Sequence, residues 1–250
     1  PCVLHIHSGK FDSWLGKPSH RRAIRVRRVI EENNAQVVCL TEKWAQTLAP
    51  LIGPTQVIIN PISPPESTNS EQPIVRDKTK ILLMGRPDPV KGASLAIAAT
   101  QLMRNQGRDI TLHLTGVEAG HKWSRQAESE GAVVAHGWLP FGELERLRSE
   151  VALLLVPSSW EGQPMVILEA MARGIPMLVS PACAEHVGDA GRVVDSNNPD
   201  DWAQEISTLL ADSQALEEMS VIGIELSRNH HIGLVTRQWQ ELYSWIKSRG

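Results

Sequence analysis

Three kinds of pattern are missing from this 250-residue sequence, and each absence argues against a class of protein. No run of 18 or more apolar residues occurs, so no candidate membrane-spanning helix is present. The cysteines, Cys2, Cys39 and Cys183, are odd in number and widely scattered, which favours neither a disulfide framework nor a metal site. Neither a Walker loop nor a GxGxxG fingerprint occurs, which argues against an NTPase or a nicotinamide-dependent dehydrogenase.

Acidic triplets and a strong net charge are also missing. No Asp-x-Asp triplet occurs, so we expect no metal ion and no metal-bridged diphosphate. The formal charge is -3, and basic residues are not interleaved with aromatic ones, which disfavours nucleic-acid binding. Together with the scattered cysteines, this composition is typical of an ordinary globular protein, and we expect a cytoplasmic location.

What the sequence does contain is a regular alternation of apolar runs and helical patterns, which predicts βαβ units and parallel sheets. A first lobe is predicted for residues 1–62, and a second for residues 63–234. The stretch from Asn60 to Lys78 is rich in Pro, Ser, Glu and Asn, as is typical of a linker. In the first lobe, strands are predicted near 2–7, 36–40 and 56–59, and helices near 19–33 and 42–51.

The second lobe has more strands and a longer helical tail. Its strands are predicted near 81–84, 110–114, 133–135, 151–156, 177–179 and 192–194, with helices near 92–106, 120–130, 142–149, 165–173 and 199–211. The tail from Leu216 to Lys247 is predicted to be helical, and its end, 235–250, to pack back on the first lobe. Three strands make a small first lobe, and Pro1 begins an apparent interior strand, so we expect that upstream sequence has been removed.

A loop with two cations follows the strand near 81–84. It runs from Gly85 to Gly92 and carries Arg86 and Lys91. The glycines allow a tight turn, Arg can bind two phosphate oxygens at once, and Lys adds a point charge. The loop therefore suits a diphosphate, although an ordinary solvated strand–helix loop explains it equally well.

The segment from Pro157 to Pro176 carries the stronger signal. A buried strand runs into a loop, and Pro164 stands where a helix can accept its missing N–H. The free N–H groups of Met165 and Val166 would then face a ligand as anion donors.

Two carboxylates lie eight residues apart in this segment, Glu161 and Glu169. If all eight steps were helical, they would be about 12 Å apart along the axis. Glycosidase acid–base pairs need about 5–9.5 Å. We therefore predict separate tasks: Glu169 on the helix accepts from ribose hydroxyls, and Glu161 in the loop reaches a sugar.

Glu161 and Glu169 in this frame resemble the E-x7-E motif of the group 1 (family 4) GT-B retaining glycosyltransferases. The loop Gly85–Gly92 resembles the family's GR-x-x-x-x-KG loop, and His136-Gly137-Trp138 resembles its base-contacting strand–turn. Asn60 resembles the Asn that closes the family's first lobe, and His7 its first-lobe histidine facing the donor sugar. These matches span nearly the whole chain in the family's order.

The resemblance implies an α/β protein with two Rossmann-like lobes, the first incomplete and the second complete. It implies that Gly85, Arg86 and Lys91 hold the donor diphosphate and that Glu169 holds the ribose. Glu161 would contact the donor sugar, with His7 near the reacting carbon. The remaining donor-binding positions implied are Gly137, Trp138, Gly162, Met165 and Val166. The donor is a nucleotide diphosphate sugar, and no cofactor is implied.

This chain departs from the family pattern after Gly162. The family places an aromatic residue and a glycine where this chain has Gln163 and Pro164. Pro164 has no N–H to donate, so contacts to the donor sugar are expected to differ.

A stripe of arginines marks the helix predicted near 19–33. Arg21, Arg25 and Arg28 fall on one face by helical spacing. The plainer interpretation is a solvated helix face, and the alternative is contact with a membrane surface or a lipid-phosphate acceptor.

Two functional hypotheses follow. The first is a hexosyltransferase that moves a sugar from a nucleotide diphosphate sugar to an acceptor hydroxyl with retention, in glycan or glycolipid biosynthesis. The second is a module that binds the sugar nucleotide without turning it over because it lacks an N-terminal half. Coding sequence for about three more strands upstream would distinguish them.

Overall fold

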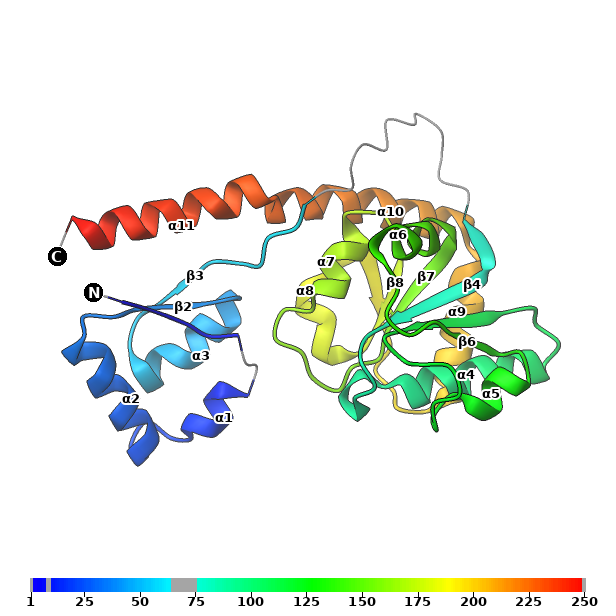
Figure 1. Ribbon diagram of the computed structural model, residues 1–250, viewed down its shortest axis with the longest axis horizontal. Helices are drawn as coiled ribbons and strands as arrows, with labels where there is room; N and C mark the ends of the chain where they lie inside the picture. The colour runs from blue at the N-terminus through cyan, green and yellow to red at the C-terminus, as the bar shows by residue number, and fades with distance from the viewer. Residues whose placement is uncertain (1, 8–9, 64–75, 249–250) are drawn as a thin grey trace. The chain divides into compact units, whose positions relative to one another are not determined.

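The computed structural model describes residues 2–7, 10–63 and 76–248. The chain forms two compact units: Pro1–Ser63 with Asn229–Gly250, and Pro64–Arg228. Each unit contains one sheet with helices packed against it (Figure 1). All strand pairs in both sheets are parallel, which confirms the predicted α/β class.

The sheet of the first unit has the order β1-β2-β3 in the part of the chain that is described. Its strands are β1 (Val3–His5), β2 (Gln36–Cys39) and β3 (Thr55–Val57). Its helices before the linker are α1 (Phe11–Leu15), α2 (Arg21–Glu32) and α3 (Glu42–Ile52). Helix α3 begins where the Thr41 hydroxyl accepts a hydrogen bond from the Trp44 N–H at 3.2 Å, which caps a first-turn donor.

The last helix of the chain, α11 (Ile232–Lys247), lies in the first unit. Its apolar stripe of Val235, Leu242 and Ile246 packs against Val38 of β2 and Ile58. The stripe recurs at helical spacing, so one face of the helix is removed from water along its length.

The second unit has a six-stranded sheet of order β6-β5-β4-β7-β8-β9. Its strands are β4 (Asp77–Met84), β5 (Thr111–Thr115), β6 (Val133–Ala135), β7 (Val151–Val156), β8 (Met177–Val179) and β9 (Gly191–Val193). Its helices are α4 (Ala93–Asn105), α5 (Arg125–Ser129), α6 (Phe141–Glu150), α7 (Met165–Met171), α8 (Ala184–Val187), α9 (Pro199–Ala211) and α10 (Ser213–Ser227). Helices cover both faces of this sheet (Figure 1).

Strands β4 and β7 are the two central strands of this sheet, and they are paired with each other. All six residues of β7 are buried, as expected for a strand covered on both faces. Because parallel strands present their carboxyl ends at one edge, the loops after β4 and β7 are neighbours at that edge.

Three predicted elements differ from those observed. The helix predicted near 120–130 is only the short α5, because Gly120 (φ 73°) turns the chain before it. The helical tail from Leu216 to Lys247 is two helices, interrupted where Ile62 pairs with His231. The predicted linker lies mostly outside the described residues, and its last two residues already belong to β4.

Candidate functional site

The loop after β4 presents two cations in different ways. Asp88 organises the loop, because its Oδ1 accepts from the Val90 N–H at 3.0 Å. The guanidinium of Arg86 lies 3.5 Å from the other Asp88 oxygen, with 73% of its side chain exposed. The side chain of Lys91 is only 25% exposed. The Arg86 side chain is therefore accessible to a ligand, whereas most of the Lys91 side chain is buried.

The loop after β7 packs directly on this loop through three contacts. The Ser159 N–H donates to the Val90 carbonyl at 2.8 Å, and Lys91 Nζ lies 2.7 Å from Glu161 Oε1. Gly92 has a φ of 68°, and a Cβ there would lie 2.3 Å from the Pro157 carbonyl oxygen, so the close approach requires glycine. The structure thus brings together the two loops that the sequence singled out separately.

A third segment, which follows β8, contacts the loop after β7. The Ser180 hydroxyl donates to the Ser158 carbonyl, and Cys183 is fully buried beside it. Burial, with the nearby Glu161 charge adding to it, raises the pKa of the Cys183 thiol to about 12. Sequence reasoning missed these residues, although their position directly after an apolar strand is the same signal that marked the other loops.

Helix α7 begins at Met165, directly after Pro164, and is seven residues long. The N–H groups of Met165 and Val166 have no partners within the helix because they belong to its first turn. Met165 is 39% exposed, whereas Ile167 and Leu168 are buried. The first turn can offer two N–H donors, but so short a helix adds little dipole.

Glu161 and Glu169 face different cations. The Glu161 carboxylate pairs with Lys91 and is 8% exposed, and the Glu169 carboxylate pairs with Arg148 of α6 and is 30% exposed. The two carboxylates therefore pair with different cations, and their separate tasks stay a prediction.

The turn after β6 carries His136, Gly137 and Trp138. The Gly116 N–H donates to the Gly137 carbonyl at 2.6 Å, which ties this turn to the end of β5. Gly137 has a φ of 64°, a left-handed conformation that glycine adopts without strain, so this position favours glycine. Trp138 is 75% exposed, and its indole is available for stacking.

Two histidines lie side by side near this turn. His113 Nδ1 and His136 Nε2 are 2.8 Å apart, with their rings stacked. Burial, followed by the neighbouring His136, lowers the pKa of His113 to about 4. Both rings can therefore be neutral at pH 7, one donating to the other.

His7 and Asn60 belong to the first unit. His7 is exposed just beyond β1, with its Nε2 3.0 Å from Nδ1 of His5. Asn60 accepts through its backbone carbonyl from His230 Nδ1 at 3.0 Å. Their geometry is therefore defined within the first unit, and the other candidate residues lie in the second.

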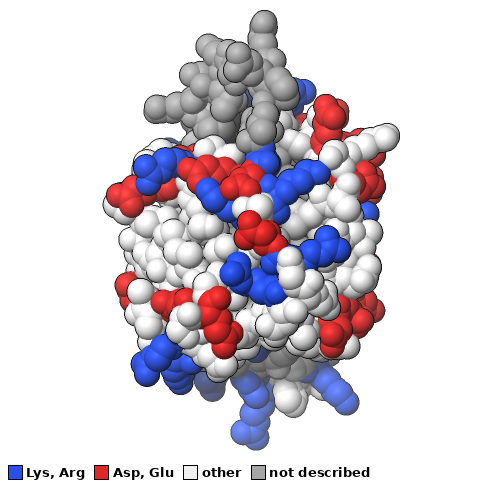
Figure 2. Space-filling view, turned by 90° about the vertical axis from the view of Figure 1, so that its right-hand side faces the viewer, with Lys and Arg blue, Asp and Glu red and all other residues white. Residues whose placement is uncertain are grey.

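We also searched the described residues for a metal site and for a membrane-spanning helix. No group of three His, Cys, Asp or Glu side chains there could hold a metal ion. None of the described helices combines the length and apolarity needed to cross a bilayer. Figure 2 shows acidic and basic side chains interspersed over most of one face, with basic side chains alone along its lower edge.

A comparison with protein families identifies the second unit. Residues 78–212, more than half of the 250-residue chain, match the family described as glycosyl transferases group 1. The chain belongs to this family. The match contains both loops at the carboxyl ends of β4 and β7, and the predicted resemblance is confirmed.

Two curated relatives are named as glycosyltransferases. The chain is 27% identical over 183 residues to a D-inositol 3-phosphate glycosyltransferase of Corynebacterium glutamicum (strain R), covering 66% of this chain and 43% of the relative. It is 30% identical over 151 residues to the O-antigen chain mannosyltransferase B of Escherichia coli, covering 57% of this chain and 40% of that protein. The chain therefore spans less than half the length of these relatives.

Solved structures share the fold at low identity. Sucrose-phosphate synthase from Thermosynechococcus elongatus superposes with a TM-score of 0.78 at 19% identity, covering 99% of this chain and 68% of that one. HepE of Anabaena, in complex with UDP, superposes with a TM-score of 0.74 at 18% identity, covering 98% and 72%. The fold is GT-B, with a three-stranded and a six-stranded parallel sheet in the described part of the chain.

Proposed function

We propose that this chain is part of an enzyme that transfers a hexosyl group from a nucleotide diphosphate sugar to an acceptor hydroxyl, with retention, in glycan or glycolipid biosynthesis. The observation that carries the proposal is the packing of the β4 loop on the β7 loop through Lys91 and Glu161. A cation whose chemistry suits a phosphate thus lies next to a carboxylate whose chemistry suits sugar hydroxyls, which supports the proposal.

The proposed roles follow from the chemistry of each group. Arg86 and Lys91 offset the negative charge that grows on the diphosphate as its bond to the sugar carbon breaks, and the backbone at Gly85 lets the phosphates approach. The first-turn N–H groups of Met165 and Val166 add hydrogen bonds to the same anion.

The remaining roles concern the sugars and the base. Glu161, with Gly162 beside it, accepts from hydroxyls of the transferred sugar, and Glu169 accepts from the ribose. Gly137 and Trp138 border the base. For His7 we propose the role that the family resemblance implies, beside the reacting carbon.

A binding panel followed by a turnover assay tests this function. Calorimetry with uridine, guanosine and adenosine diphosphates should find at least one binder, and the matching nucleotide sugars should then release diphosphate when an acceptor is present. UDP-glucose, inositol phosphate and O-antigen-type acceptors belong in the panel because relatives and neighbours carry these names. Silence from all three diphosphates would defeat the proposal.

The rival function is a module that binds the sugar nucleotide without turning it over. The chain spans less than half the length of the relatives described above, so turnover is tested separately from binding. Nucleotide binding without turnover, both in the chain alone and in the chain expressed with any adjoining coding sequence, would support this rival.

We further propose that α2 contacts an anionic lipid surface. Arg21, Arg25 and Arg28 are exposed and have no ion-pair partner among the described residues. Ile24 (45% exposed) and Val29 (52% exposed) flank them on the same side. Exposed apolar side chains beside unpaired arginines suit a headgroup interface.

Co-sedimentation with vesicles tests the lipid contact. The chain should bind vesicles containing about 30% phosphatidylglycerol and should not bind pure phosphatidylcholine, because each cation near such a surface adds about 1 kcal/mol. Replacing Arg21, Arg25 and Arg28 with Gln should abolish binding. Replacing the exposed Arg108, Arg125 and Arg146 of the second unit should not, and equal losses in both triple variants would contradict the proposal.

A further inference from the structure

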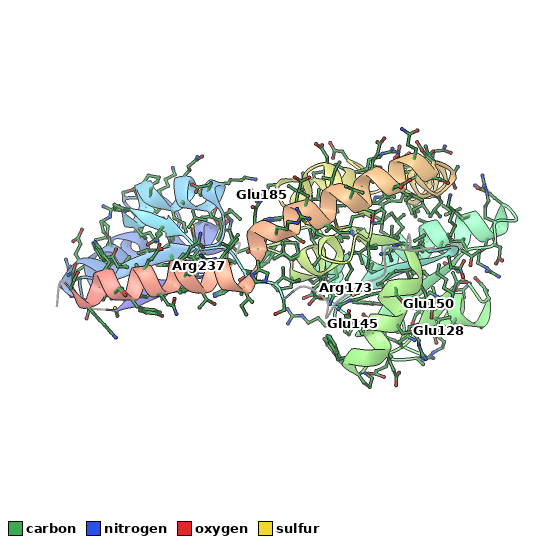
Figure 3. All side chains as sticks on the ribbon, turned by 90° about the horizontal axis from the view of Figure 1, so that it is seen from above. Glu128, Glu145, Glu150, Arg173, Glu185 and Arg237 are labelled. Atoms are coloured by element: carbon green, nitrogen blue, oxygen red, sulfur yellow. The ribbon has the colours of Figure 1, made fainter. Side chains whose placement is uncertain are left out.

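The Glu169 carboxylate is the end of a chain of charged side chains in the second unit. Its Oε2 accepts from Nη2 of Arg148, and Nη1 of Arg148 donates to Glu145 Oε1 at 2.7 Å. The other Glu145 oxygen accepts from Arg173 Nε at 2.7 Å. Figure 3 shows Glu145 on α6 and Arg173 just beyond α7 close to one another. The network therefore ties α6 to α7.

Arg76 fixes the backbone beneath this network. Its Nη1 donates to the carbonyls of Arg148 at 2.8 Å and Val151 at 3.0 Å, and its Nη2 donates to the carbonyl of Arg173 at 2.6 Å. Burial lowers the pKa of Arg76 to about 10, so it remains charged at neutral pH. The ends of the two helices are thus held in place, together with the arginines they carry.

Glu169 is the most exposed side chain of this network. Arg148 is 5% exposed and Arg173 11%, whereas Glu145 is 23% exposed and Glu169 30%. Within the described residues, Glu169 Oε1 has no hydrogen-bond partner. The carboxylate is therefore held through one oxygen and offers the other to a ligand.

Stability alone does not explain why Arg148 is charged. Buried ion pairs are often no more stabilising than apolar side chains of similar volume, because both charges lose their hydration. The Nε of Arg148 is also buried without a hydrogen-bond partner in the described part of the chain. An apolar residue would fill this position without leaving an unsatisfied donor.

We propose that Arg148 is a positioning residue, which orients the Glu169 carboxylate toward the ribose hydroxyls of the nucleotide donor. This inference rests on the proposed function. A glutamate side chain has several accessible rotamers, and holding it in one before binding removes the ordering cost from the binding step. Arg148 therefore sets the discrimination between nucleotides with and without ribose hydroxyls and leaves the diphosphate contacts unchanged.

Calorimetry with paired ligands tests this role. The probe is the tightest binder among uridine, guanosine and adenosine diphosphates, compared with its 2′,3′-dideoxy counterpart. The wild-type chain should prefer the ribonucleotide by about tenfold or more, which corresponds to a hydrogen bond to a charged group. Arg148→Gln should reduce this preference to less than about threefold and leave the dideoxy affinity unchanged. Arg146→Gln, an exposed arginine on the same helix, is the matched control and should keep the full preference.

Glu169→Ala, which removes the hydrogen-bonding group, separates this inference from the function on which it rests. Loss of the ribose preference in Glu169→Ala together with its retention in Arg148→Gln would overturn the positioning role alone. Retention of the preference in Glu169→Ala would overturn the ribose assignment itself. General loosening of the fold would weaken both ligands equally and keep their ratio, which would also count against Arg148 as a positioning residue.

A second variant covers the case in which Arg148→Gln does not fold. The double variant Arg148→Met, Glu145→Leu removes both charges and fills the space with apolar groups. It should show the same loss of ribose preference, and a preference equal to that of the wild-type chain would overturn the proposal.

Discussion

Lys91 is shared between two anions in the proposed site. Its ammonium group pairs with Glu161 at 2.7 Å, so a diphosphate has to compete with a carboxylate for it. Removing the ammonium group with Lys91→Ala should weaken nucleoside diphosphate binding by about 10- to 100-fold, since a charge-assisted contact contributes roughly 1.5–3 kcal/mol. The free nucleoside, which has no phosphate, should lose little affinity. Calorimetry with both ligands measures the difference.

Lys80 provides the control for Lys91→Ala. It also forms an ion pair at 2.7 Å, with Glu150, but it lies earlier in β4 and away from the loop. Lys80→Ala should leave both affinities unchanged. If Lys91→Ala weakened nucleoside and diphosphate equally, the diphosphate assignment would be wrong.

His113 makes stability depend on pH. Burial, His136 and Lys80 together lower its pKa from 6.5 to about 4, against the opposite influence of Glu150 and Asp77. Between these two values the unfolded chain binds a proton that the folded chain does not. The stability that neutral His113 contributes is therefore complete above pH 6.5 and is lost as the pH falls toward 4.

His113→Gln tests this dependence because glutamine does not titrate. Urea denaturation should show that the wild-type chain loses more stability between pH 7 and pH 5 than the variant does. The variant should still lose some, since burial also lowers the pKa of His136, His5 and His230. Identical losses would indicate that the His113 ring remains hydrated in the folded chain.

Four of the candidate residues that sequence analysis identified share one property: each lies in a short local pattern of glycine and charge after an apolar strand. Arg86, Lys91, Glu161 and Glu169 are of this kind. Arg148 was not identified because its significance depends on Glu169, which is 21 residues away and on another helix. Pairings between distant segments leave no local signal.

Among the elements, predictions succeeded where the hydrophobic period was uniform. Strand β7 consists of six apolar residues and was predicted at its observed bounds. The tail was not predicted correctly, because helical periodicity continues on both sides of Arg228–His230 and hides the interruption. The interruption is caused by the Ile62–His231 pairing, which the tail's own sequence does not show.

The buried face of α11 can be tested with one substitution at two positions. Leu242 is 5% exposed and packs in the first unit, whereas Leu234 on the same helix is 41% exposed. Leu242→Ala should lower the free energy of unfolding of the first unit by about 2–4 kcal/mol, and Leu234→Ala by less than about 1 kcal/mol. Hydrogen exchange of the β2 amides measures this unit separately from the second. Equal effects at the two positions would show that α11 does not stabilise the sheet.

At the scale of the whole molecule, the candidate residues divide unequally between the units. Most lie in the second unit, whose core cluster runs from Ile81 to Leu209 and whose six strands pair without any contribution from the first. The family match at 78–212 falls entirely within it. His7 lies in the first unit. Nucleotide binding should therefore be separable from turnover.

A fragment of residues 76–228 tests this separation. Because its sheet, its core and the Arg76 anchor are all retained, it should fold cooperatively and bind the same nucleoside diphosphate as the full chain. Each tenfold change in affinity corresponds to about 1.4 kcal/mol. A fragment whose affinity is within about threefold of that of the full chain therefore means that the first unit contributes less than about 0.7 kcal/mol to the free energy of binding. His7→Ala in the full chain should likewise leave binding unchanged and reduce turnover. A folded fragment without nucleotide affinity would show that the first unit forms part of the nucleotide site, and the division of tasks between the units would be wrong.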